Sequence, residues 1–121
     1  MSCYFQANDT DIWNPSNSVA RLFLEQAGNL SNLMGVESGL GPVIEDECEI
    51  DFTAFTKFVD SLVKSYQQSN NSAFRSLIGG FVSVALVLVE RGGGVLESIT
   101  PEHAEMWESV RAANAMGMPT G

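Results

Sequence analysis

The sequence predicts a mainly helical α+β fold: a small four-helix bundle with an N-terminal β-hairpin and a central apolar helix. Three observations predict it. Four segments carry apolar residues at helical spacing, residues 81–89 are apolar at every position except Ser83, and two short strand-like runs flank Asn8-Asp9. A chain of 121 residues fits one domain. We expect a single globular domain over 1–114 and a flexible tail over 115–121.

The hairpin is predicted over residues 2–13. Cys3–Gln6 and Asp11–Trp13 are rich in aromatic and β-branched residues, and Asn8-Asp9 between them tolerates turn geometry.

The first helix is predicted over about 15–33. Asn14 is a capping residue, Pro15 suits the first helical position, and Ser16 offers a later start. Gly35 ends the helix. The glycine-rich stretch that follows, to Pro42, reads as a loop, and 43–50 as a short extended segment.

Three further helices are predicted over 52–66, 73–90 and 101–114. Asp51 caps the first of them, Ser72 the second, and Thr100-Pro101 opens the third. The predicted helix over 73–90 is apolar on all sides in its second half, which places it at the centre of a bundle. The alternative for this Val-rich segment, Phe81–Val89, is a buried strand.

The charge balance excludes some classes of partner. Fifteen acidic and six basic residues give a net charge of −9. Such a chain lacks the basic stripe that binds a nucleic acid and is repelled by anionic membrane surfaces. The apolar run from Leu77 to Val89 is shorter than the ~20 residues that cross a bilayer. A basic protein partner suits the charge better.

The two cysteines, Cys3 and Cys48, show no metal-ligand spacing. The simpler interpretation is that both thiols are reduced in a cytoplasmic protein, and the alternative is a disulfide between Cys3 and Cys48. Met1–Asn8 has neither the basic region nor the apolar stretch of a signal peptide, so we expect a cytoplasmic location.

The acidic run at 45–51 is the main candidate site. Alternation in an extended segment puts Glu45, Glu47, Glu49 and Asp51 on one face. With Asp46, these residues form a candidate patch for a basic partner. The spacing fails the test for a calcium-binding loop, because Ile50 and Thr56 stand where glycine and glutamate are required. We expect no metal and no cofactor.

No catalytic constellation is visible, so the sequence leans away from an enzyme. Acidic neighbours raise the pKa of the Cys48 thiol, the opposite of what a nucleophile needs. His103 lacks a partner that would make it a general base. If the protein were an enzyme, Glu47, Glu49 and His103 are where we would look. Trp13 and Trp107 are candidate interface anchors.

Residues 13–23 (WNPSNSVARLF), 46–51 (DECEID) and 81–90 resemble a small family of uncharacterised, single-domain actinobacterial proteins. The similarity extends over about residues 2–91. It implies a bacterial cytoplasmic setting and transfers no activity or functional residue.

The function predicted from these features is a non-enzymatic protein-binding module, of the kind that immunity proteins or regulatory inhibitors provide against a basic protein. The alternative is a small-molecule-binding or accessory protein of a bacterial biosynthetic pathway, with an apolar pocket between the hairpin and the second and third helices. A homodimer through the first or fourth helix, which would bury Leu24, Met34 and Met106, stays open.

Overall fold

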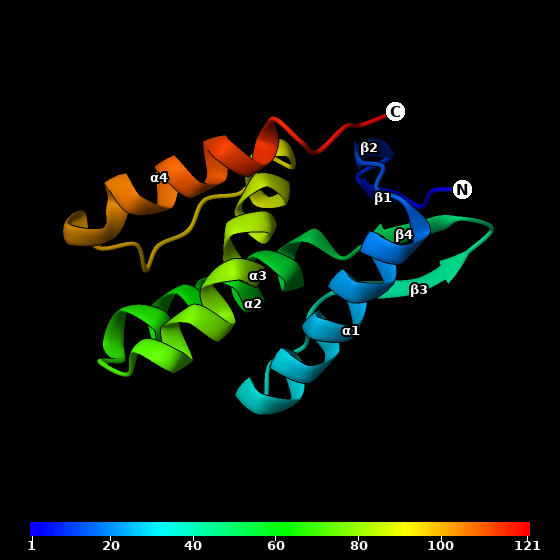
Figure 1. Cartoon of the computed structure of the whole chain (residues 1–121). Coiled ribbons are helices and arrows are strands. Elements are labelled where there is room, and N and C mark those ends of the chain that lie inside the picture. The colour runs from blue at the N-terminus through cyan, green and yellow to red at the C-terminus, as the bar shows by residue number, and fades with distance from the viewer.

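The computed structural model describes residues 1–121 and contains four strands and four helices. Figure 1 shows the sheet and the first helix on one side of the molecule, the fourth helix on the other, and the remaining two helices between them. The elements are, in chain order, β1 (Tyr4–Ala7), β2 (Thr10–Trp13), α1 (Asn17–Met34), β3 (Leu40–Ile44), β4 (Glu47–Ile50), α2 (Phe52–Gln68), α3 (Ser72–Arg91) and α4 (Pro101–Ala115).

The sheet overturns the predicted fold class. The four strands lie in the order β2-β1-β4-β3, with β1 antiparallel to β2 and parallel to β4, and β4 antiparallel to β3. The protein is therefore an α+β fold with a mixed sheet, and a four-helix bundle carrying a separate hairpin is wrong. The reason is that one edge of β1 pairs with β4, some forty residues away along the chain, and such pairing leaves no local signal.

Both hairpins turn through two residues with positive φ. These are Asn8 and Asp9 in the first hairpin, and Glu45 and Asp46 in the second. Two consecutive positive φ values give the type I′ geometry that matches the twist of the flanking strands. Asn8-Asp9 suits this turn, whereas glutamate rarely adopts positive φ. The second turn therefore falls inside the stretch 43–50 that was expected to be one extended segment, and the start of β3 falls in the stretch that was expected to be a loop.

α1 packs through a small aromatic cluster onto the inner face of the sheet. Ser16 caps the helix, its side chain accepting from the Val19 amide, and Gly35 ends it in the left-handed conformation. Phe23 on α1 lies edge-on to Phe5 and Trp13, with ring centroids 5.7 and 5.2 Å apart. This cluster joins the first hairpin to the helices.

α3 is the core helix, so the Val-rich segment is helical and not a buried strand. Eight of its residues are buried, including the continuous run Ala85–Val89. By length and composition α3 is also apolar enough to cross a membrane, but 44% of its most apolar window is buried inside the protein. Burial against α2 on one side and α4 on the other makes it the centre of a compact domain.

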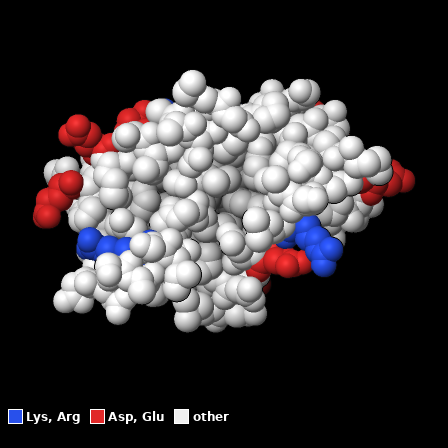
Figure 2. Space-filling view, viewed as in Figure 1, with Lys and Arg blue, Asp and Glu red and all other residues white.

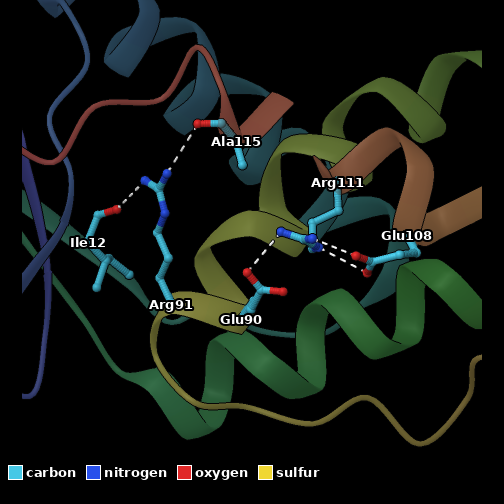
Figure 3. Close-up of polar contacts among 6 residues, drawn as sticks. All are labelled: Ile12, Glu90, Arg91, Glu108, Arg111 and Ala115. Carbon is cyan, nitrogen blue, oxygen red and sulfur yellow. Dashed lines mark hydrogen bonds and ion pairs between the residues drawn. The ribbon is translucent and has the colours of Figure 1, made fainter. Parts of the chain in front are cut away.

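Two arginines tie distant elements together (Figure 3). Arg91, at the end of α3, donates to the carbonyl oxygen of Ile12 at 2.9 Å and to that of Ala115 at 3.3 Å. Arg111 on α4 forms ion pairs with Glu90 at 2.8 Å and with Glu108 at 2.6 Å. Arg91 thereby fixes β2 beside the end of α4.

The segment expected to be a flexible tail contacts the connection between β2 and α1. Met118 is 6% exposed. The amide of Asn14 donates to the carbonyl oxygen of Pro119 at 2.7 Å. Residues beyond α4 therefore close over the connection between β2 and α1.

Candidate functional site

The outward face of the sheet gathers acidic side chains from two strands. Along β4, Glu47 and Glu49 are exposed while Cys48 and Ile50 are buried. Asp11 on β2 is also exposed, and β2 pairs with the edge of β1 that lies opposite β4. The alternation of a strand, which predicted one face for the glutamates, accounts for this placement.

Gln6 on β1 stands between these carboxylates and orients two of them. Its Nε2 donates to Oδ1 of Asp11 and to Oε2 of Glu47, each at 2.8 Å. In the parallel pair, Gln6 is also opposite Glu49. One neutral amide therefore links acidic residues from both neighbouring strands without neutralising their charge. Neither Gln6 nor Asp11 was expected at the site, because only cross-strand pairing brings them to the acidic run.

The other acidic residues of the run do not continue the strand alternation. Glu45 and Asp46 form the turn of the β3–β4 hairpin, where their positive φ breaks the alternation. Asp51 caps α2, its Oδ1 accepting from the Ala54 amide at 3.2 Å. Asp51 is thus committed to the helix, and the strand alternation expected through 51 ends before it. We name Asp11, Glu45, Asp46, Glu47 and Glu49 the acidic sheet face.

No basic side chain forms an ion pair with the acidic sheet face. The three ion pairs of the protein are Arg21–Glu25, Arg111–Glu90 and Arg111–Glu108, all on helices. In Figure 2, acidic atoms appear at the right-hand end of the molecule, where the β3–β4 hairpin lies in Figure 1. A second acidic group lies at the left, around the start of α4. The two groups are therefore separate surfaces.

The two tryptophans lie inside the protein. Trp13 and Trp107 are each 3% exposed. Trp107 packs against Tyr66 with ring centroids 4.7 Å apart, and its Nε1 donates to Oε1 of Gln67 at 3.3 Å. Neither ring is offered at the surface as an anchor for a partner.

His103 belongs to the start of α4. Its Nδ1 lies 2.9 Å from Oγ1 of Thr100, and its ring is edge-on to Tyr66 at 6.3 Å. This contact explains why the Thr100 hydroxyl makes no capping bond to the helix that it precedes. The histidine orders the entry to α4, and none of these contacts joins it to Glu47 or Glu49.

Both cysteines are free and buried. Burial, then the neighbouring Cys3, raises the pKa of Cys48 to about 11. Burial and Asp46 also raise the pKa of Cys3. Nowhere do three or more His, Cys, Asp or Glu side chains converge in a way that could hold a metal ion.

The acidic sheet face thus gathers exposed carboxylates from β2, β4 and the β3–β4 turn. No curated protein and no solved structure matches the chain. A family described as of unknown function, DUF6086, matches residues 1–120, so the match includes the tail that the sequence resemblance left out. The chain therefore belongs to the family of unknown function DUF6086.

Proposed function

We propose that the protein is a non-enzymatic binding module that docks on a basic protein through the acidic sheet face. The observation that carries the proposal is the set of exposed carboxylates on β2, β4 and the β3–β4 turn, none of which forms an ion pair. Uncompensated charge on a rigid surface attracts an oppositely charged partner and accelerates its association.

Regulation or inhibition of the partner, in the manner of an immunity protein, is the role that suits such a surface. Binding alone covers a basic site on the partner, so no chemistry is required of this chain. The setting we propose is the bacterial cytoplasm, where two buried, unpaired thiols such as Cys3 and Cys48 remain reduced.

The test is a charge reversal with a probe of simple chemistry. A deca-lysine peptide is titrated into the ¹⁵N-labelled protein at low and at physiological ionic strength. We expect amide shifts confined to β4, the β3–β4 turn and β2, with affinity falling as salt rises. The variant Glu45→Lys/Glu47→Lys/Glu49→Lys should weaken binding at least tenfold.

The matched control is Glu97→Lys/Glu102→Lys/Glu105→Lys. These three residues are exposed, and the net charge changes by the same amount. If the two triple variants lose the same affinity, the protein attracts cations through its total charge alone and the proposed docking face is wrong.

A further inference from the structure

We infer that the cavity between α1, α3 and the end of α4 is a binding site for a small, uncharged, mostly apolar molecule that carries one hydrogen-bond acceptor. This site is separate from the acidic sheet face and does not depend on the function proposed for it. The cavity has a volume of about 310 Å³, and eight of the twelve residues that line it are hydrophobic. Ligand sites in proteins usually measure about 300–1,000 Å³.

The inner wall of the cavity is aromatic and held by stacking. Phe23 and Phe81 stack at 4.8 Å between centroids, and Trp13 lies edge-on to Phe23 at 5.2 Å. All three rings line the cavity and are at most 5% exposed. Their packing fixes the shape of the wall before any ligand arrives.

The outer wall leaves apolar side chains in water. Val19 and Leu22, on the side of α1 that lines the cavity, are 46% and 57% exposed. On α3 the facing positions include Gly80 and Val84. Figure 2 shows this face of the molecule hollowed near its centre, with the charged residues at its margins. A ligand that fills the hollow removes apolar surface from water.

Trp13, which lines the cavity, has an indole N–H without a partner in the protein. Trp13 is 3% exposed, and its Nε1 makes no hydrogen bond within the protein, unlike that of Trp107, which donates to Gln67. Among side-chain oxygen and nitrogen atoms, only Oδ1 of Asn14 is both shielded from solvent and without a hydrogen-bond partner. Nε1 of Trp13, which has no partner either, is therefore accessible to solvent. Because an indole N–H normally has an acceptor, we expect an oxygen or nitrogen atom of the ligand to take the place of solvent there.

The lining also defines the charge of the ligand. It contains no Lys, Arg, Asp, Glu or His; its polar side chains are the amides of Gln26 and Asn114. Nδ2 of Asn114 already donates to Oγ of Ser83 at 2.8 Å. A charged head group would lose hydration here without gaining a counter-ion, so neutral ligands are favoured.

The test uses 1-octanol as the probe, titrated into the ¹⁵N-labelled protein. We expect saturable binding in which the indole N–H signal of Trp13 moves downfield, as an indole proton does when it gains an acceptor. The indole signal of Trp107, already bonded to Gln67, is the internal reference and should move little. Octanoate should bind at least tenfold more weakly than 1-octanol. Equal affinity for the two, or no saturable shift of the Trp13 signal, would overturn the inference.

The blocking variant is Gly80→Leu. A Cβ at this position meets no atom within 4 Å, so the new side chain enters the cavity without displacing the backbone. Replacing glycine within a helix also favours the folded state, so we expect the variant to fold. Binding of 1-octanol should fall at least tenfold.

The matched control is Gly28→Leu. Gly28 is also helical, has no atom within 4 Å of a Cβ, and does not line the cavity. This variant should bind as the wild type does. Unchanged binding in Gly80→Leu would contradict the proposal. A wild-type dimer, seen by sedimentation, that only Gly80→Leu dissociates would assign the cavity to a second copy of the chain and overturn it too.

Discussion

At the scale of single residues, burial decides the chemistry of the thiols. Cys48 is fully buried on β4, and its Sγ donates to the carbonyl oxygen of Gly41 at 3.3 Å. Loss of hydration disfavours the thiolate and is the largest cause of its raised pKa. The charge of neighbouring acidic residues, from which the sequence predicted a raised pKa, is a smaller contribution. The thiol is therefore a packing group in the core.

The raised pKa of Cys48 predicts how stability depends on alkaline pH. The pKa moves from 9.0 to about 11 on folding, so between these values the folded protein holds a proton that the unfolded chain has lost. The free energy of unfolding is thus fully retained below pH 9 and falls as the pH rises toward 11. Urea denaturation across this range measures the fall, which should be smaller for Cys48→Val. An identical slope in both proteins would contradict the assignment.

At the scale of elements, the helices were predictable because their signals are local. Ser16 and Asp51 cap α1 and α2 through a side-chain oxygen, and Asn71 caps α3 in the same way, one residue before the expected Ser72. The apolar stripe of each helix then fixes its buried face. By contrast, β3 contains Gly41 and Pro42 and turns into β4 through Glu45 with positive φ, so no local pattern marked it as a strand.

Asp51 differs from the other acidic residues of the run because its side chain caps α2. We expect Asp51→Ala to lower the free energy of unfolding by about 1 kcal/mol, because the Ala54 amide loses its partner. Asp51→Asn should retain most of the stability, since asparagine caps equally well. Chemical denaturation measures both. If Asp51→Asn is as unstable as Asp51→Ala, the charge of Asp51 is what matters and the capping role is wrong.

At the scale of the whole molecule, contacts between segments distant in the sequence could not be predicted from local sequence patterns. The acidic run was found because its residues are contiguous. Gln6 and Asp11 were missed because they reach it only through the pairing of β1 with β4 and β2. The apolar cavity lies beside α1 and not beside α2, since its walls come from three helices and the end of β2. No single stretch of sequence contains such a site.

Arg91 offers a test of how these distant parts are held. Arg91→Met removes the donors to the carbonyl oxygens of Ile12 and Ala115. We expect a loss of about 2 kcal/mol in the free energy of unfolding, because charged donors to partly buried carbonyls are costly to remove. Arg91→Lys should restore part of it. Arg21→Met, which breaks only the exposed pair with Glu25, is the control and should cost less than about 1 kcal/mol. Equal losses for Arg91→Met and Arg21→Met would contradict this role.

The parallel pairing of β1 with β4 also sets an order of events during synthesis. A two-stranded hairpin alone is marginally stable in water, so β1 and β2 gain lasting order only when β4 has left the ribosome. Until then Phe5 lacks Cys48, its partner on β4. The first hairpin is thus synthesised early but becomes stably ordered late. Its folding rate is governed by the closure of the loop that joins β1 to β4 and contains α1.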